Sequence, residues 1–355
     1  MSQFFSKRHA SLIPYVPGEQ PRDQQYTKLN TNESPFPPSP KVMEAVTGQV
    51  GRLQLYCDPD STLLRQKLAE IYGVRPTQVI VGNGSDEVLN FAFMAYGDEE
   101  NPMAFPEISY GFYPVFAQLN RIPYTPIPLK ADLSLDPKDY MGIGKTIVIA
   151  NPNAPTGLSL SLAEIEAIVA SNPGNVVIID EAYVDFGGES AVSLVDKYDN
   201  LLITMTFSKS RSLAGARLGF GIGSEAIIND LNTIRCSINP YNVNTLTQAA
   251  GIAALEENDC YMANCQTIME NRAWVTGQLE QLGFAVIPSL TNFVFARHPG
   301  IAGDTLYRML KERGILVRHF TKAQIADYNR ITIGTRAQME QLVSVTAQIL
   351  KETAL

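Results

Sequence analysis

The chain has 355 residues, 45% of them apolar, which is enough to bury a sizeable core and suggests about two domains. Its formal net charge is −8, and no run of lysines or arginines stands out, which argues against a nucleic-acid-binding surface and against attraction to anionic lipid. No uncharged apolar stretch is long enough to span a bilayer, and residues 1–10 are polar, so we expect a soluble, cytoplasmic protein.

The cysteines and histidines do not suggest a disulfide framework or a metal site. Cys57 and Cys236 are isolated, and Cys260 and Cys265 lie five residues apart in a helical pattern, which puts them on different faces. The chain has three histidines, and none of them has metal-ligand spacing with another ligand. We therefore expect reduced thiols and no metal.

After a polar, proline-rich arm, the chain alternates short apolar runs with amphipathic stretches. Continuous runs rich in β-branched residues are typical of strands buried on both faces of a largely parallel sheet, and they occur at residues 79–81, 146–150, 176–179 and 201–205. Helical segments lie between them at 86–96 and 160–170, and Ser161 with Glu164 forms a capping-box pattern at the second. This pattern predicts a large doubly wound α/β domain over residues 41–244.

The remaining sequence predicts a smaller α+β domain. A long helical stretch at 245–282 comes first, and a last helix begins at 337. Between them the expected elements are strands at 284–287 and 292–296, a helix at 304–313, and strands at 315–319 and 330–333. We expect residues 1–40 to complete this domain together with 245–355.

Polar motifs follow the predicted strands, and in open α/β sheets ligands bind beyond the carboxyl ends of the strands. The first strand ends in a glycine turn, where Gly84 permits a tight turn and the amides of Ser85 and Asp86 can point at an anion. Farther along the chain, Tyr110 offers an aromatic face for stacking. The proline-fixed loop at 151–157 can hold an amide side chain over a site, although an ordinary surface turn fits its composition equally well.

The last two motifs suggest a specific chemistry. Asp180 follows a buried run directly, where a carboxylate can keep a pyridine nitrogen protonated, and Tyr183 could hydrogen-bond a phenolic oxygen of the same ring. Lys209 follows the strand at 201–205 and can condense with an aldehyde, while Arg217 can hold phosphate oxygens. Each motif alone is also compatible with an ordinary structural role, namely a helix cap, a core tyrosine or a lysine facing solvent.

Taken together, the chain resembles the histidinol-phosphate aminotransferases, a group of fold-type-I enzymes that depend on pyridoxal phosphate. The resemblance covers nearly the whole chain and rests on six motifs: LNTNESP (29–35), GNGSDE (82–87), NPNAPTG (151–157), DEAY (180–183), TFSKSRSLAGARLGF (206–220) and RITIGT (330–335). It implies a large pyridoxal-phosphate-binding domain with a mostly parallel doubly wound sheet, plus the smaller domain described above.

The resemblance also implies roles for residues. Lys209 would be the Schiff-base lysine and proton-transfer base, Asp180 would pair with the ring nitrogen, and Tyr183 would pair with the ring oxygen. Tyr110 would stack on the ring. Gly84 would be part of the cofactor site, and the phosphate would be held by the amides of Ser85 and Asp86 and by Thr206, Ser208 and Arg217.

For the substrate, the resemblance implies two arginines and the arm. Arg318 and Arg330 would bind the phosphate of histidinol phosphate or the carboxylates of glutamate and 2-oxoglutarate. Tyr15 would close over the substrate, and Asn32 would contact it. Tyr56 would reach the phosphate site of a neighbouring subunit, which implies a homodimer with shared active sites.

Departures from the family pattern leave alternatives open. Ala154 stands where many relatives have an asparagine that contacts the ring oxygen, so Asn153 would have to reach in or Tyr183 would act alone. We expect an aminotransferase that exchanges an amine between histidinol phosphate and 2-oxoglutarate in histidine biosynthesis. The alternatives are an aromatic amino-acid aminotransferase, a threonine-phosphate decarboxylase and, from another class, a non-catalytic α/β ligand-binding protein.

Overall fold

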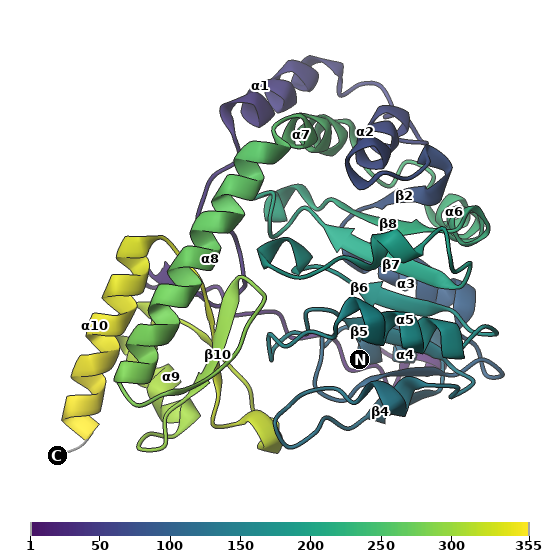
Figure 1. The fold of residues 1–355 in the computed structure, drawn as a ribbon. Helices are drawn as coiled ribbons and strands as arrows, with labels where there is room; N and C mark the ends of the chain where they lie inside the picture. Colours follow the sequence, from purple (N-terminus) through teal and green to yellow (C-terminus); the bar gives the residue numbers. More distant parts are fainter. Residues whose placement is uncertain (1, 354–355) are drawn as a thin grey trace.

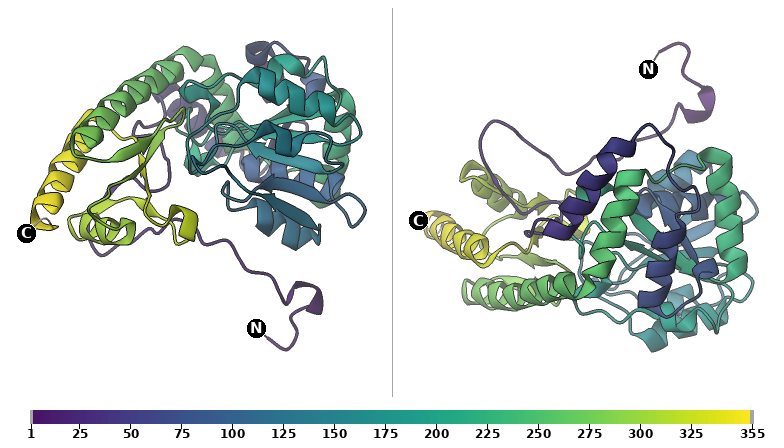
Figure 2. Two further views of the ribbon diagram at one scale, coloured as in Figure 1. Left: turned by 60° about the horizontal axis from the view of Figure 1, so that its bottom comes forward. Right: turned by 90° about the horizontal axis from the view of Figure 1, so that it is seen from above.

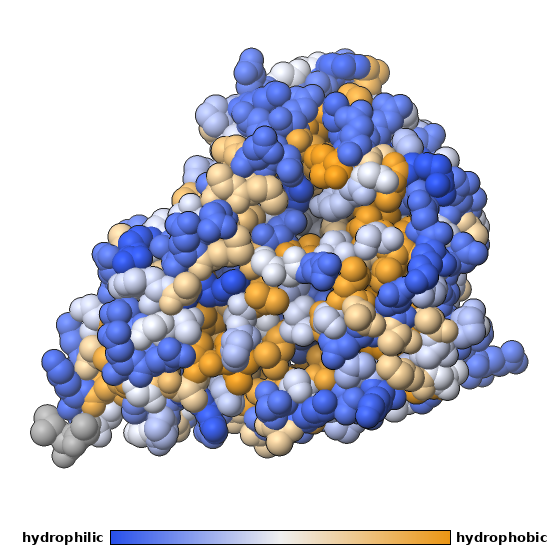
Figure 3. Space-filling model, viewed as in Figure 1, coloured by the Kyte–Doolittle hydropathy of each residue, from blue (hydrophilic) through white to orange (hydrophobic). Residues whose placement is uncertain are grey.

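The computed structural model describes residues 2–353, which form a large unit around a seven-stranded sheet and a smaller unit beside it (Figure 1). The long helix α8 (Asn258–Gln281) runs from the large unit to the small one. On the face seen in Figure 3, the outer edge is mainly hydrophilic, whereas hydrophobic side chains show toward the middle, where the sheet lies.

The large sheet is mostly parallel, as predicted. Its strands pair parallel except β8, which runs antiparallel to both neighbours. In spatial order the strands are β2 (Val79–Gly82), β8 (Gly219–Gly223), β7 (Leu201–Thr206), β6 (Val177–Asp180), β5 (Thr146–Ala150), β3 (Met103–Pro106) and β4 (Tyr124–Ile127). All but β4 are buried along their whole length, which explains the continuous apolar runs.

Helices cover both faces of this sheet, because successive strand residues point to opposite sides. Ile147, Ile149 and Ile179 join one core with helices on the first face, whereas Val148 and Ile178 join another core on the second face. The first face carries α1 (Pro40–Gln49), α2 (Thr62–Tyr72), α5 (Leu162–Ser171) and α7 (Thr245–Glu256). The second face carries α3 (Ser85–Tyr96), α4 (Tyr113–Asn120) and α6 (Glu225–Ile238).

The small unit is built on a four-stranded antiparallel sheet. Its strands in spatial order are β12 (Arg318–His319), β13 (Asn329–Thr332), β10 (Phe293–Arg297) and β9 (Ala285–Ile287). The helices α8, α9 (Gly303–Glu312) and α10 (Arg336–Thr353) complete it. From the arm, β1 (Thr27–Lys28) pairs parallel with β11 (Ile315–Leu316), so the arm joins the small unit, while the start of the described chain extends away from the body (Figure 2).

Short 3₁₀ helices connect these elements: η1 (Lys7–His9), η2 (Val50–Arg52), η3 (Pro76–Gln78), η4 (Pro137–Tyr140), η5 (Val184–Phe186), η6 (Ala191–Leu194), η7 (Ala214–Ala216) and η8 (Ala323–Ile325). No helix within residues 2–353 combines the length and the hydropathy needed to cross a membrane.

Two parts of the chain differ from the expected pattern. The helical stretch at 245–282 is interrupted at Glu257, whose φ of −109° and ψ of 30° separate α7 from α8. Buried residues of α7, such as Ala254, belong to the core of the large unit, whereas Cys265 of α8 belongs to the core of the small unit. The chain therefore passes from the core of the large unit to that of the small unit early in α8, whereas the sequence placed the boundary at residue 245. The predicted strand at 315–319 is two short strands that belong to different sheets.

Candidate active site

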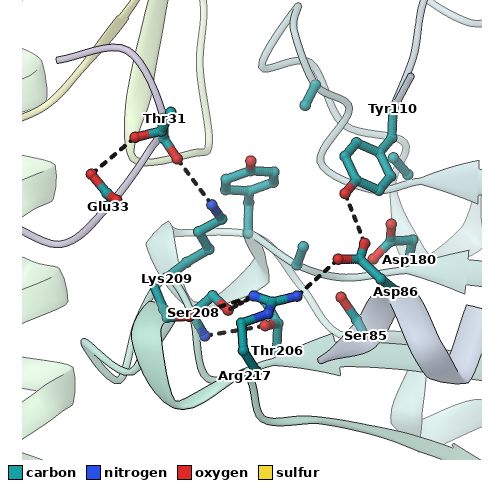
Figure 4. A pocket seen from close by; sticks show the side chains of 15 residues that line it. Thr31, Glu33, Ser85, Asp86, Tyr110, Asp180, Thr206, Ser208, Lys209 and Arg217 are labelled. Carbon is teal, nitrogen blue, oxygen red and sulfur yellow. Dashed lines mark hydrogen bonds and ion pairs between the residues drawn. The ribbon is translucent and has the colours of Figure 1, made fainter. Parts of the chain in front are cut away.

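A cavity lies beyond the carboxyl ends of β5, β6 and β7, where the sequence placed the polar motifs. Its lining includes Ser85 and Asp86 from the start of α3, Asp180 from the end of β6, and Lys209 from the loop after β7. Figure 4 shows Lys209 and Tyr110 on opposite sides of this space, with Arg217 at one end. Segments that are far apart in the sequence thus meet in one place.

The Arg217 end of the cavity is suited to an anion. One guanidinium nitrogen of Arg217 lies 2.9 Å from a carboxylate oxygen of Asp86, and the other lies 3.5 Å from the hydroxyl of Ser208. The amide of Ser208 donates to the hydroxyl of Thr206 over 3.1 Å. Together with the free amides at the start of α3, these groups provide the donors that a phosphate requires.

Glycine is needed at two points beside this end. Gly84 has a φ of +88°, and a Cβ there would lie 2.6 Å from the guanidinium of Arg217. A Cβ on Gly219 would lie 2.1 Å from the backbone nitrogen of Ser85. The absence of side chains therefore lets β8 and the start of α3 approach closely.

Asp180 is a buried carboxylate that has no cationic partner among residues 2–353. Tyr113 donates a hydrogen bond to one of its oxygens over 2.8 Å, and Thr204 donates to the other over 3.3 Å. Burial raises the pKa of Asp180 to about 6, although these two hydrogen bonds act in the opposite direction. Because Asp180 lines the cavity, it is suited to a cationic group bound there.

Tyr110 lines the cavity and is held in place from two sides. Its hydroxyl donates to Asp86 over 2.7 Å, and its ring packs edge-on against Tyr113 with centroids 5.6 Å apart. Its aromatic face is therefore fixed for stacking on a planar ligand.

Lys209 lies on the side of the cavity opposite Tyr110 (Figure 4). Its Nζ is 3.2 Å from the carbonyl oxygen of Thr31 and 5.9 Å from the ring centroid of Tyr183. The hydroxyl of Tyr183 accepts a hydrogen bond from Asn32 over 2.9 Å. The arm thus contributes directly to the surroundings of the lysine.

A second cavity adjoins the first and shares Tyr110, Tyr183 and Lys209 with it. Arg318 and Arg330 line it, and they are directly opposite each other in the β12–β13 pair. Like charges opposite each other destabilise a sheet, and neither arginine has a carboxylate partner among the described residues. Burial lowers the pKa of Arg330, whose guanidinium carbon lies 5.3 Å from the ring centroid of Phe293 and 5.7 Å from that of Phe320. This pair is therefore suited to an anionic ligand.

Most of the predicted site residues meet at these two cavities. The first is lined by Ser85, Asp86, Tyr110, Asp180, Tyr183, Thr206, Ser208, Lys209 and Arg217. The second is lined by Tyr15, Asn32, Arg318 and Arg330, together with residues shared with the first. Gly84 borders the first cavity through Arg217, as described above.

Two predicted residues lie elsewhere. Asn153 is fully buried, and its side chain bonds to the carbonyl of Ile108 and the hydroxyls of Ser109 and Thr156. It lines neither cavity, so its predicted cofactor contact finds no support in this arrangement. Tyr56 is 83% exposed, stacks on Tyr241 and lines neither cavity of its own chain.

Sequence reasoning missed three contributors to the site. Tyr113 and Thr204 bind Asp180 from behind the cavity wall, and Thr31 acts through its backbone carbonyl. The sequence offers one signal for Tyr113, which is that it follows the predicted site residue Tyr110 by three positions. A backbone carbonyl leaves no signal in the sequence.

The fold and the site are those of an aminotransferase. Residues 24–345 match the family of class I and II aminotransferases, and the chain belongs to this family. It is 49% identical over 352 residues to histidinol-phosphate aminotransferase 1 of Hydrogenovibrio crunogenus, covering 99% of each protein. It is also 49% identical over 351 residues to histidinol-phosphate aminotransferase 2 of Rhizobium meliloti, covering 99% of this chain and 100% of that protein.

Solved structures agree on the fold. The crystal structure of histidinol-phosphate aminotransferase from Sinorhizobium meliloti in complex with pyridoxal-5'-phosphate matches with a TM-score of 0.90. The match covers 99% of both chains at 24% sequence identity. The chain therefore has the fold expected from its motifs.

Proposed function

We propose that this protein transfers the amino group of L-histidinol phosphate to 2-oxoglutarate, yielding imidazole acetol phosphate and glutamate. The relatives of nearly half identical sequence over their full length support this substrate, since both are histidinol-phosphate aminotransferases. The observation that carries the proposal is the pair of arginines beside Lys209, which have no carboxylate partner among residues 2–353, because a phosphorylated amine needs both an anion site and an adjacent reactive group.

The residues fit pyridoxal 5'-phosphate as the cofactor. Asp180 is a buried carboxylate without a cationic partner in the described chain, and it suits the protonated ring nitrogen. The donors around Arg217 suit the phosphate, and Tyr110 suits the face of the ring. Tyr183 and Asn32 suit the ring oxygen. When bound, pyridoxal phosphate supplies an aldehyde that takes up an amino group and a ring that withdraws electrons from the neighbouring carbon.

The chain's own residues would then act as follows. Lys209 holds the cofactor while no substrate is bound, and its freed amine moves the proton away from the substrate carbon that bears nitrogen. Asp180 keeps the proton on the ring nitrogen, which stabilises negative charge on that carbon. Arg318 and Arg330 orient the substrate through its phosphate and hold a carboxylate of 2-oxoglutarate in the return half of the reaction.

We infer that the functional unit is a homodimer in which Tyr56 completes the phosphate site of the partner. Tyr56 is exposed and lines neither of these two cavities in its own chain, which supports this. The cytoplasmic location expected from the sequence stays a prediction, and the four unpaired cysteines are consistent with a reducing compartment.

The test is an amine-exchange assay in which purified protein is incubated with histidinol phosphate and 2-oxoglutarate and glutamate is measured. Phenylalanine and threonine phosphate serve as alternative donors, and release of carbon dioxide is followed with the latter. Borohydride reduction followed by peptide mapping should label Lys209. Lys209→Ala should abolish turnover and labelling, whereas Lys197→Ala, at an exposed lysine paired with Glu166, should change neither. Label on another residue, or faster exchange with a different donor, would refute the proposal.

A further inference from the structure

The charge of Asp180 depends on groups that lie outside the cavity. Its carboxylate is buried, and no lysine or arginine among residues 2–353 pairs with it. An isolated buried carboxylate tends to take up a proton and become neutral. Hydrogen bonds from neutral donors are therefore what favours its ionised form here.

Two buried side chains donate to Asp180, and Tyr113 makes the shorter of the two hydrogen bonds. It is the first residue of α4, it has no exposed surface, and its Oη lies 2.8 Å from Oδ2 of Asp180. Burial and the neighbouring carboxylate raise the pKa of Tyr113 well above the ordinary value of a tyrosine. The hydroxyl therefore keeps its proton and always acts as the donor.

The second donor comes from the neighbouring strand. Thr204 of β7 is the register partner of Asp180 in the β6–β7 pair, and its Oγ1 lies 3.3 Å from Oδ1. Each carboxylate oxygen thus has one side-chain donor on the protein side and keeps its remaining acceptor capacity for a group in the cavity.

We propose that Tyr113 is a positioning residue whose hydroxyl, from behind the cavity wall, keeps the Asp180 carboxylate ionised and turned toward the ring nitrogen of the cofactor. This rests on the proposed cofactor. Tyr113 lines neither cavity, so it touches neither cofactor nor substrate and acts through Asp180. Its ring also supports Tyr110, so the removal of the hydroxyl alone separates the two contributions.

Tyr113→Phe is the informative substitution because it keeps the ring contacts with Tyr110 and Phe93 and removes only the donor. Without that donor the Asp180 carboxylate becomes more basic, and the shared proton moves from the ring nitrogen toward the carboxyl. We expect kcat to fall about 10- to 100-fold, as for a lost hydrogen bond to a charged group, with little change in KM.

The readout that separates positioning from general structural support is the protonation state of the ring nitrogen. Holoenzyme is prepared with pyridoxal phosphate labelled with ¹⁵N in the ring, and its ¹⁵N chemical shift is measured without substrate. In Tyr113→Phe the resonance should move from the pyridinium position toward that of a neutral pyridine. The matched control is Tyr140→Phe, because Tyr140 is equally buried but its hydroxyl has no hydrogen-bond partner within the described residues. This control should leave the resonance and kcat unchanged.

An unchanged ¹⁵N shift in Tyr113→Phe would overturn the proposal, even if kcat fell. If that variant does not fold, Thr204→Val should move the resonance in the same direction by a smaller amount, and Thr204→Ser should restore it; no movement in Thr204→Val would also overturn the proposal. Wild-type protein that does not bind the labelled cofactor would refute the proposed function instead, so the two failures can be told apart.

Discussion

At the scale of single residues, the arginine pair of the second cavity is the feature most specific to a substrate. Arg318 and Arg330 oppose each other across two strands without a compensating carboxylate in the described chain, an arrangement that costs stability unless an anion binds. The hydrogen bonds they do make are to backbone carbonyls, namely those of Val16, Pro17 and Asn30. Their guanidiniums are thus oriented before a ligand arrives.

We predict that Arg330→Gln lowers kcat/KM for histidinol phosphate by about 100-fold, because a charged hydrogen bond to phosphate is lost. Kinetics with histidinol, which lacks the phosphate, should show a much smaller loss. Arg297→Gln provides the control, since Arg297 lies over Tyr328 at the exposed end of β10 and outside both cavities. Equal losses with histidinol and histidinol phosphate would contradict a phosphate-binding role.

Glu181, beside Asp180, makes stability depend on pH. It is buried and accepts hydrogen bonds from the hydroxyl of Ser190 and the amide of Ala191, yet burial raises its pKa from 4.5 to about 8. Because the folded pKa lies above the unfolded one, the contribution of this group to stability is complete below pH 4.5 and is lost as the pH rises through 8.

We predict that Glu181→Gln reduces this dependence, since glutamine can keep both contacts without ionising. The free energy of unfolding of the variant minus that of wild type should increase by on the order of 2–4 kcal/mol when the pH is raised from 5 to 8. Urea unfolding of the cofactor-free protein at fixed protein concentration measures this. If the free energies of unfolding of the two proteins differ by the same amount at both pH values, Glu181 does not titrate in this range.

The site residues that could be predicted are those whose position follows from a strand end. Asp180 and Lys209 come directly after buried runs, so their convergence follows from the rule for parallel sheets. Tyr113 and Thr31 could not be predicted in this way, because one acts from behind the cavity wall and the other through its backbone. The surroundings of Asn153 could not be predicted either, because its loop motif does not reveal that its amide donates to the carbonyl of Ile108.

At the scale of elements, strand β8 shows that β-propensity alone does not predict every strand. Its sequence Gly219–Gly223 contains three glycines, which are depleted in strands, and no strand was expected there. Gly219 must nevertheless lie against the backbone of Ser85, which only a residue without Cβ permits. By contrast, the runs at 146–150 and 201–205 were predicted closely because burial on both faces leaves a continuous apolar signal.

We predict that Gly219→Ala moves β8 and the start of α3 apart and loosens the anion-binding end of the cavity. Pyridoxal phosphate should bind about 10- to 100-fold more weakly, because the amides of Ser85 and Asp86 lose their alignment. Absorbance titration of cofactor-free protein measures the affinity. Gly215→Ala is the control, since a Cβ there meets no atom within 4 Å. Unchanged affinity in Gly219→Ala would mean that the strand adjusts without disturbing the site.

At the scale of the whole molecule, the chain exposes apolar residues that its own fold leaves uncovered. They are concentrated on α1, η2, α2 and the segments between them, and comprise Met43, Val50, Leu53, Leu55, Tyr56 and Leu63. The start of the described chain also extends away from the body (Figure 2), and the arm before β1 exposes Phe4, Ile13 and Val16. Apolar surface of this extent is typical of a protein interface, and a second copy of the chain is the occupant that the proposed role of Tyr56 requires.

If Tyr56 serves the active site of the partner, two inactive or weakened variants should complement each other, which would not happen if Tyr56 served its own chain. Lys209→Ala abolishes the site of its own chain, and Tyr56→Ala should weaken the site of the partner. If the two variants are mixed, unfolded and refolded together, the hybrid dimer contains one site with both Lys209 and Tyr56 intact. Random pairing should then restore about one quarter of the wild-type activity, since half of the dimers are hybrids with one complete site. Glutamate production after mixing, compared with each variant treated alone, measures this. If Tyr56 served its own chain, the hybrid would contain only one site without the lysine and one without the tyrosine, and mixing would restore nothing.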